Sequence, residues 1–454
     1  MRKPTTPTAI LVLLGAATLG LTAQEPAEPP AGEERGETQT LVLEGGTRTQ
    51  IRLAFPAAEH DPSIAGSPDG GDAVHAAREI EQTLRDDLEQ DPIFNTQGPT
   101  ELAVVALSGD RDRDFEQYRS LGNEVVLLVN LKQEGDKLVL DGWVYDLPSK
   151  QSILGKRFRG NRSQTRLIAH YMADALHYQF SGRRGISLTT IAFHSDRSGD
   201  QELYLMDYDG RNQRRISGHQ STSGYCDWSP TGDAIAYLSY FSGTPSIYYV
   251  DLASGNKVPV YSQGPLNLSP SFSPDGRRIA FAHSRGSNID IYVCDRDCRD
   301  PQRLTDSAGI DTNPSWSPDG SQLAFTSSRS GRPNIYVMDA DGSNLRRVSF
   351  EGEYNDGAAW RPDGSHLIYA SRPGRYRFQI ASTSLVDLVT RLLTSGPDSY
   401  EEPSFSPDGQ RIAFTVKRGA ESQVFVMSAD GGDWRQLTHE GNNAGPDWSG
   451  YPTN

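Results

Sequence analysis

The side chains best suited to chemistry do not form a recognisable catalytic pattern in this sequence. No Gly-x-Ser-x-Gly nucleophile elbow occurs, so the triad of an α/β-hydrolase lacks its serine. No glycine-rich phosphate loop follows an expected strand, and the 44 glycines suit a turn-rich β protein instead. We therefore expect a protein that is not an enzyme and that holds no cofactor.

Histidines and aspartates are the remaining candidates for metal binding or proton transfer. The histidines of the C-terminal part are His194, His219, His283, His366 and His439. None of them directly precedes the first strand of the repeat described below, so we interpret them as packing or surface residues. Most aspartates fall in repeated turns, where an aspartate accepts backbone hydrogen bonds. A cation bound near the axis of the fold stays an open alternative.

The three cysteines are Cys226, Cys294 and Cys298. Cys294 and Cys298 flank an expected turn between two strands. An exported protein meets an oxidising compartment, which favours a disulfide there. A pair of free or buried thiols is the alternative, and the sequence does not decide between the two.

One stretch recurs along the second half of the chain: Pro314-Ser315-Trp316-Ser317-Pro318-Asp319-Gly320. The proline presets φ at the first corner of a turn, and the glycine takes the left-handed position that closes it. Close copies lie at 270–276 and 403–409, weaker copies at 227–232 and 359–364, and a stub at 446–450. The stretch therefore indicates a strand, a tight turn and a second strand in each copy.

The spacing of these copies predicts the architecture. Their aromatic anchors are Trp228, Phe272, Trp316, Trp360, Phe405 and Trp448, separated by 44, 44, 44, 45 and 43 residues. A fixed period of about 40–45 residues built from strands is typical of a β-propeller. The first unit starts at its second strand, Thr190–Phe193, and the last supplies only a first strand. We therefore expect six blades, with the C-terminal strand closing the ring.

The first part of the chain has a different character. Arg2 and Lys3 precede an apolar run from Ala9 to Leu21, and Ala23 suits a cleavage site, so residues 1–23 are predicted to be a secretory signal peptide. An uncleaved membrane anchor is the alternative, although the run is shorter than a span needs. Residues 24–40 are acidic and proline-rich, as in a disordered linker.

Residues 41–181 alternate between strand and helix patterns and are predicted to form a small α+β domain before the propeller at 182–454. Helices are expected after Asp72 and Ser163, and strands at 50–55, 104–107, 124–131, 137–147 and 152–159.

The net charge of the whole chain is 44 − 59 = −15, which argues against nucleic acid as a partner.

Residues just before the first strand of each blade should ring the opening of the central channel. These channel-mouth residues are Ser223, Gly224, Tyr225, Asn267, Leu268, Ser269, Asp311, Thr312, Asn313, Asn355, Asp356, Gly357, Tyr400, Glu401, Glu402, Asn443, Ala444 and Gly445. They differ from blade to blade and are small, polar and mildly acidic. Such a ring suits a protein surface, and a set of solvated loops that binds only water is the alternative.

The chain resembles the TolB family, the periplasmic propeller components of the Tol–Pal envelope system. The resemblance rests on the α+β domain, the junction Ser181-Gly182-Arg183-Arg184-Gly185, the Ser-Pro-Asp-Gly repeats and the terminal Asp447-Trp448-Ser449. It implies an exported, non-enzymatic scaffold that supports outer-membrane integrity and constriction during cell division. It also implies a monomer outside the complex, with no membrane span after signal cleavage.

The resemblance further implies two partners. Pal, the peptidoglycan-associated lipoprotein, would bind at the channel mouth. The inner-membrane protein TolA would bind an N-terminal box made of Leu41, Val42, Leu43, Glu44, Gly45 and Gly46. From the residues alone this stretch is an edge strand or a docking peptide, and the resemblance favours the docking peptide.

Two other functions compete with this one. An exported peptidase-related propeller that lacks its hydrolase domain would share the Ser-Pro-Asp-Gly repeat. A metal-dependent enzyme working in the channel would use acidic residues such as Asp311 or Glu401. A recognisable nucleophile would support the first alternative and retained channel metal the second.

Overall fold

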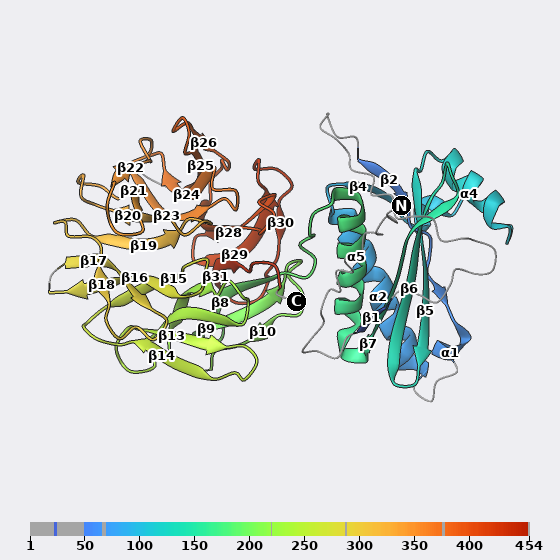
Figure 1. Ribbon diagram of the computed structural model, residues 1–454, viewed down its shortest axis with the longest axis horizontal. Coiled ribbons are helices and arrows are strands. Elements are labelled where there is room, and N and C mark those ends of the chain that lie inside the picture. Colours follow the sequence, from blue (N-terminus) through green and yellow to red (C-terminus); the bar gives the residue numbers. More distant parts are fainter. Residues whose placement is uncertain are drawn as a thin grey trace, which may run out of the picture. The chain divides into compact units, whose positions relative to one another are not determined.

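The computed structural model describes residues 22–24, 50–65, 70–218, 220–286, 288–374 and 377–452 (Figure 1). These residues form two compact units that divide near residue 188. The predicted signal peptide, linker and N-terminal box lie outside the described residues, except for the short strand β1 (Thr22–Gln24). The backbone of β1 pairs antiparallel with β7 (Gln151–Asn161), and β7 contains the strand expected at 152–159.

The N-terminal unit is built on a mixed sheet with the strand order β1-β7-β6-β5-β2-β4, and β3 pairs with β5. Its other strands are β2 (Ile51–Ala54), β3 (Glu59–His60), β4 (Phe94–Gln97), β5 (Val125–Glu134) and β6 (Lys137–Asp146). Strand β2 runs parallel to β4 and β5, whereas β5, β6 and β7 form an antiparallel meander. The α+β class of this unit is confirmed.

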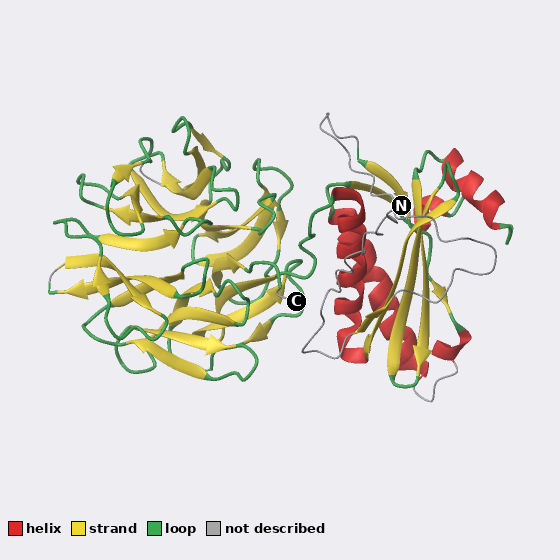
Figure 2. Cartoon of the chain, in the orientation of Figure 1, coloured by secondary structure: helices red, strands yellow, loops and turns green. Residues whose placement is uncertain are grey.

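Two long helices, α2 (Gly70–Gln90) and α5 (Thr165–Ser181), pack against this sheet (Figure 2). Ile80, Leu84 and Leu88 of α2 recur at helical spacing and are fully buried in the shared core. Helix α5 ends where Gly182 adopts a left-handed φ of 66°. The shorter helices are α1 (Pro62–Ala65), α3 (Pro99–Leu102), α4 (Arg111–Ser120) and the 3-10 turn η1 (Arg162–Gln164).

Two local predictions for this unit are wrong. The expected strand at 104–107 is a loop after α3, with Val104 and Leu107 exposed and only Val105 packed against the core. A short apolar run forms no strand without a neighbour to pair with. Ser163 lies inside η1 and does not cap α5, because the Asn161 N–H bonds Gln164 Oε1 one turn earlier at 2.8 Å.

The second unit consists of six four-stranded antiparallel sheets, which confirms the six-bladed propeller. The blade that joins both ends of the unit contains β31 (Asn443–Trp448), β8 (Thr190–Ser198), β9 (Asp200–Asp207) and β10 (Arg214–Arg215). The next two contain β11 (Ser223–Trp228), β12 (Ala234–Ser239), β13 (Ser246–Asp251) and β14 (Lys257–Tyr261), then β15 (Asn267–Phe272), β16 (Arg278–Arg285), β17 (Asn288–Asp295) and β18 (Gln302–Arg303).

The remaining three blades follow in chain order. They contain β19 (Asp311–Trp316), β20 (Gln322–Ser327), β21 (Asn334–Asp339) and β22 (Arg346–Arg347), then β23 (Tyr354–Trp360), β24 (His366–Arg372), β25 (Gln379–Ser384) and β26 (Thr390–Leu392), then β27 (Ser399–Phe405), β28 (Arg411–Arg418), β29 (Glu421–Ser428) and β30 (Arg435–Gln436).

The predicted closure of the ring is confirmed. Strand β31 pairs antiparallel with β8, so that Trp448 lies opposite Ile191 (Figure 1). Trp448 is buried, and its indole Nε1 donates to Thr189 Oγ1 at 2.9 Å. The sheet edge that β8 would otherwise expose is therefore covered.

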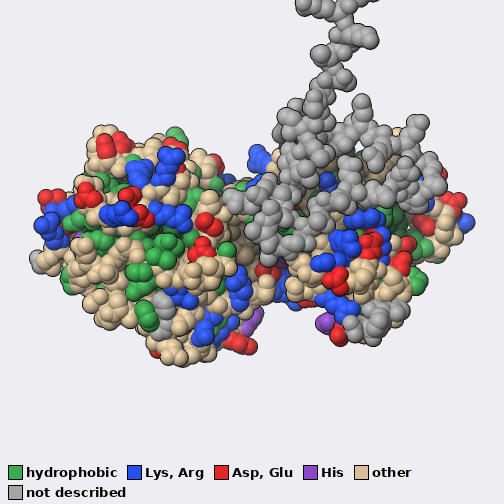
Figure 3. Space-filling view, turned by 60° about the horizontal axis from the view of Figure 1, so that its bottom comes forward, with side chains coloured by type: hydrophobic (Ala, Val, Ile, Leu, Met, Phe, Trp, Pro, Cys, Tyr) green, Lys and Arg blue, Asp and Glu red, His purple; other side chains and the backbone are tan. Residues whose placement is uncertain are grey.

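The repeated turns are built as predicted. Gly320 has a φ of 71°, and Asp319 accepts hydrogen bonds from Ser317 Oγ at 2.6 Å and Ser321 N at 3.0 Å. Consecutive turns also touch, because a Cβ placed on Gly320 would lie 3.5 Å from Pro274 of the preceding blade. Trp316 of β19 packs between its own sheet and the sheet of the preceding blade. On the face drawn in Figure 3, basic and acidic side chains of the propeller are interspersed.

Cys294 and Cys298 form a disulfide across the turn between β17 and β18, which settles the choice that the sequence left open. Both cysteines are buried in one hydrophobic cluster with Tyr261 and Phe281. Cys226 is a free thiol on β11.

Candidate functional site

The channel-mouth residues lie within the innermost strands and not in loops before them, which corrects their predicted placement. Strands β11, β15, β19 and β31 begin at the first residue of their triplet, and β23 and β27 begin one residue earlier. The reason is that the first two residues of each triplet still pair with the second strand of the blade.

A β-bulge follows the second residue of every triplet and places the third residue in an unusual conformation. The third residues are Tyr225 (φ 49°), Ser269 (50°), Asn313 (51°), Gly357 (65°), Glu402 (54°) and Gly445 (59°). Only glycine adopts this left-handed region without cost, yet four of the six positions carry a side chain. Bulges redirect the side chain that they carry. The six bulges, one from each blade, therefore form a ring of fixed but chemically different groups.

The first residue of each triplet is buried and holds the surrounding loops. Ser223, Asn267, Asp311, Asn355 and Asn443 have no exposed surface, and Tyr400 has almost none. Asn267 Nδ2 donates to the carbonyl oxygens of Pro245 and Gln263, both at 3.0 Å. Arg329 Nη2 donates to Asp311 Oδ2 at 2.8 Å. These six residues support the mouth from beneath and do not present an accessible surface.

Tyr400 departs from the polar residues at the equivalent positions. Its ring meets Phe414 and Trp434 edge-on, with centroids 6.3 and 5.2 Å apart. It is thus part of a blade core, and a charged residue in its place would have to be buried. The aromatic anchor of the mouth is instead Tyr225, whose side chain is 51% exposed.

The second and third residues supply the accessible part of the ring. Besides Tyr225, the partly exposed members are Leu268, Thr312, Asn313, Asp356, Gly357, Glu401, Glu402 and Gly445, whereas Gly224, Ser269 and Ala444 are buried. Hydrogen bonds connect them across blades. Ser269 Oγ donates to Asn313 Oδ1 at 2.5 Å, and Asn313 Nδ2 donates to Asp356 Oδ1 at 2.8 Å.

The second strands contribute residues that the sequence interpretation missed. Thr326 Oγ1 donates to Asp356 Oδ1 at 2.7 Å, and Thr415 Oγ1 donates to Glu402 Oε2 at 2.8 Å. Lys417 Nζ lies 2.7 Å from Glu401 Oε2. The sequence could have indicated these residues only through their distance along the chain from the repeated turn. That distance identifies the cross-strand partner of each mouth residue once the strand register is known.

His194, which was interpreted as a packing or surface residue, packs beside this group. It lies on β8 opposite Ala444, and a Cβ placed on Gly445 would lie 2.7 Å from its ring. Burial lowers the pKa of His194, while Glu402 acts in the opposite direction. Burial likewise raises the pKa of Tyr225, helped by the nearby charges of Glu402 and Asp356. The mouth thus combines negative charge with one exposed phenol.

Two aspartates connect neighbouring innermost strands just beyond the bulges. Asp447 Oδ2 accepts from Trp228 N at 3.0 Å, and Asp227 Oδ2 accepts from Phe272 N at 2.7 Å. Desolvation raises the pKa of Asp447 to about 7 and also raises the pKa of Asp227, which the charge of Asp447 raises further. Their role in the described structure is to join one blade to the next.

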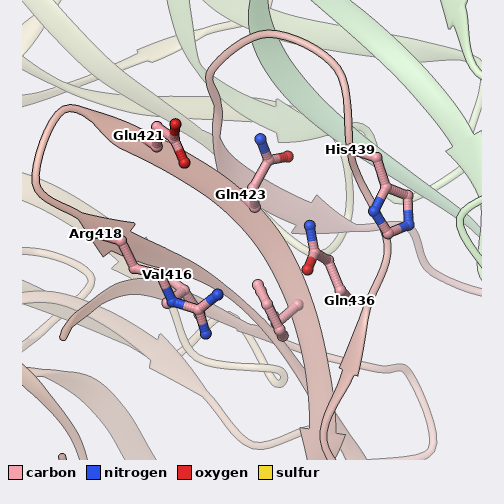
Figure 4. A pocket seen from close by; sticks show the side chains of 7 residues that line it. Val416, Arg418, Glu421, Gln423, Gln436 and His439 are labelled. Atoms are coloured by element: carbon pink, nitrogen blue, oxygen red, sulfur yellow. The ribbon is translucent and has the colours of Figure 1, made fainter. Parts of the chain in front are cut away.

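Within the described ranges, no group of three or more His, Cys, Asp or Glu side chains is arranged to hold a metal ion. No described helix combines the length and apolar character needed to cross a membrane. A small cavity of about 160 Å³ lies in the blade formed by β27–β30, lined by residues outside the triplets (Figure 4).

Comparison with known proteins agrees with this architecture. A family model described as "TolB beta propeller domain" matches residues 178–451. The Tol-Pal system protein TolB of Syntrophotalea carbinolica is 34% identical over 160 residues, which cover 34% of this chain and 37% of the relative. The corresponding protein of Geobacter sulfurreducens is 35% identical over 165 residues, covering 36% and 38%. The chain thus matches less than half the length of these curated relatives.

A solved structure gives a longer match. The crystal structure of TolB from Acinetobacter baumannii superposes with a TM-score of 0.74 and 25% sequence identity, covering 88% of this chain and 97% of that one. The match therefore includes both the α+β unit and the propeller.

Proposed function

The chain belongs to the TolB β-propeller family, and from this premise we propose that it is a periplasmic Tol–Pal component that binds other proteins and is not an enzyme. In this role it would support outer-membrane integrity and constriction during cell division. The observation that carries the proposal is the ring of six left-handed bulge residues, which differ in type while their backbones repeat. A repeated frame with varied side chains suits recognition of one particular partner.

We propose that the channel mouth binds the peptidoglycan-associated lipoprotein Pal. Tyr225 supplies an exposed aromatic anchor, the kind of residue that dominates binding energy in protein interfaces. Tyr240 and Phe241 add two more exposed rings at the same end of the blade, since Tyr240 N bonds the carbonyl of Thr222, directly before β11. Around these rings, Glu402 and Asp356 present carboxylates already fixed by hydrogen bonds, so little ordering remains to be done on binding.

We also propose that Leu41–Gly46 binds TolA and that residues 1–23 direct export. Both proposals rest on the family resemblance, and the residues concerned lie outside the described ranges. A chain without residues 41–46 should keep Pal binding and lose TolA binding, since the two sites belong to different units. Loss of both activities would contradict two separate sites.

The channel-mouth proposal is tested by titrating Pal from the same organism into the mature protein by calorimetry. Tyr225→Ala and Glu402→Gln should each weaken binding about tenfold or more, as expected for residues at the centre of an interface. Val389→Ala is the matched control, because Val389 is an exposed apolar residue next to the edge strand β26. Absence of Pal binding by the unmodified protein, or equal affinities for Tyr225→Ala and Val389→Ala, would contradict the proposal.

A further inference from the structure

The small cavity in the blade formed by β27–β30 lies where this blade departs from an arginine arrangement found in two other blades. In the blade of β19–β22, Arg329 Nε donates to Ser327 Oγ at 2.8 Å, and Nη2 donates to Asp311 Oδ2. Arg197 does the same in the closing blade, bonding Ser195 Oγ at 2.9 Å and Asn443 Oδ1 at 2.7 Å. In both blades the arginine folds inward and two polar residues hold it.

Arg418 occupies the equivalent position but has no such partners. The residues at the places of Ser327 and Asp311 are Val416 and Tyr400, paired across β28 and β27, and neither supplies an acceptor toward it. Arg418 Nε turns to Asp398 Oδ2 at 2.8 Å, and its side chain is 58% exposed. A cavity of about 160 Å³ opens between Arg418, Glu421 and His439 (Figure 4).

The floor of this cavity is preorganised. Gln423 Nε2 donates to Gly441 O at 2.8 Å, and Gln436 Nε2 donates to Thr438 O at 2.7 Å. Both amides are therefore fixed, and Gln436 keeps its Oε1 as an acceptor. Phe425 and Val416 are buried beneath them and give the floor an apolar part. Fixed groups of this kind reduce the entropy lost when a ligand binds.

The charged groups that line the cavity are not paired with each other, and Arg418 is paired through its Nε with Asp398, which is not a lining residue. Among the described residues, the Nη groups of Arg418, the carboxylate of Glu421 and the imidazole of His439 have no hydrogen-bond partner, although all three line the same cavity. A guanidinium binds a carboxylate well through two parallel N–H groups. A carboxylate such as that of Glu421 suits an ammonium group.

From this arrangement we infer that the cavity binds a small zwitterion, a free α-amino acid. Arg418 takes the carboxylate of the ligand, and Glu421, its cross-strand neighbour, takes the ammonium group. The apolar floor accepts a short side chain. The cavity is well below the size of sites for drug-like molecules, which excludes bulky ligands. This site is separate from the channel mouth and independent of the function proposed for it.

Saturation-transfer NMR on the full mature chain tests the inference with three probes: L-alanine, N-acetyl-L-alanine and L-alaninamide. The first carries both charges, and each of the others lacks one. L-Alanine should bind in the millimolar range, as expected for so few atoms. Either derivative should bind at least tenfold more weakly. Equal signals from the three probes, or no signal from L-alanine, would overturn the inference.

Substitutions assign the two charged groups. Arg418→Gln and Glu421→Gln should each reduce L-alanine binding at least tenfold, and their unfolding midpoints should stay unchanged because both side chains are exposed. Arg391→Gln, on the exposed edge strand β26, is the matched control and should bind as the unmodified protein does. Binding that survives both substitutions would place the ligand elsewhere and refute the site.

Discussion

The two ends of the innermost propeller strands are built on different principles. At the turn end, Ser-Pro-Asp-Gly recurs, and Asp319 is bonded within its own turn by Ser317 and Ser321. At the mouth end, residue types differ between blades and the hydrogen bonds cross from one blade to the next, as from Asn313 to Asp356. The repeated turns are therefore specified locally, whereas the mouth depends on contacts between neighbouring blades.

This difference suggests that the turn end serves the stability of the propeller and that the mouth end serves recognition of a partner. The sequence of the turn end can repeat because each copy forms the same tight turn, which reverses the direction of the chain. The mouth end can vary because the frame beneath it, made by buried residues such as Asn267 and Asn355, does not depend on what the bulge presents. The predictions below test whether the two ends can be perturbed independently.

The largest effect is expected from removing the closing strand. A chain that ends at Gly441 lacks β31 and should lose several kcal/mol of unfolding free energy, because removal of one buried tryptophan such as Trp448 alone costs about 3–5 kcal/mol. Urea unfolding followed by tryptophan fluorescence measures this loss. A chain that ends at Tyr451 keeps β31 and serves as the control. Equal midpoints for the two chains would show that closure does not stabilise the ring.

A smaller but still large loss is expected at the turn end. Trp316→Ala should cost about 3–5 kcal/mol, because the buried ring fills the space between two sheets and its Nε1 bonds Ser271 O at 3.2 Å. Thr312→Ala, at the other end of the same strand, should cost less than about 1 kcal/mol, since Thr312 is partly exposed. Urea midpoints compare the pair. If Thr312→Ala were as damaging as Trp316→Ala, the mouth would be a structural element.

The carboxylate pair near the mouth predicts a dependence on pH. The pKa of Asp447 is raised from 3.8 to about 7, so the folded protein binds its proton more tightly than the unfolded chain does. The stability linked to this proton is fully present below pH 3.8 and is lost as the pH rises toward 7. Asp447→Asn should flatten the change in unfolding free energy between pH 4 and 8 by about 1 kcal/mol or more.

Melting temperatures across this range, with the exposed Asp300→Asn as a control, measure the effect. An unchanged slope for Asp447→Asn would mean that Asp447 stays ionised in the folded protein.

The smallest effect is expected in an exposed turn. Hydrogen bonds from Ser317 and Ser321 lower the pKa of Asp319 to about 2, so its contribution is present above pH 3.8 and is lost as the pH falls toward 2. Because the side chain is exposed, Asp319→Ala should cost less than about 1 kcal/mol at neutral pH. Denaturant unfolding at neutral and acidic pH should show the variant and the parent converging at low pH. A constant difference would point to the turn backbone instead.

The blade number, the closure and the turns could be predicted because they depend on local chemistry repeated at a fixed interval. The mouth could be predicted only in part. The sequence indicates that residues such as Tyr225 and Glu402 lie near one another, but the bulge that redirects them depends on strand register. His194 was missed for the same reason, since it joins the mouth from the second strand.

Which side chains are buried could not be predicted from residue type alone. Tyr400 has the composition of a recognition residue, and only its packing against Phe414 and Trp434 shows that it belongs to a core. In the N-terminal unit, helix α2 could be predicted from the spacing of Ile80, Leu84 and Leu88. The loop at 104–107 could not be predicted, because an apolar run forms a strand only where another strand is available to pair with it.

The pairing of β8 with β31 has a consequence for biogenesis. During synthesis β8 is made early, and its partner strand follows only after the intervening blades have been made. Until then the first blade lacks its inner strand and keeps an edge that could pair with other chains. The seam thus delays completion of the propeller until its last strand has been synthesised.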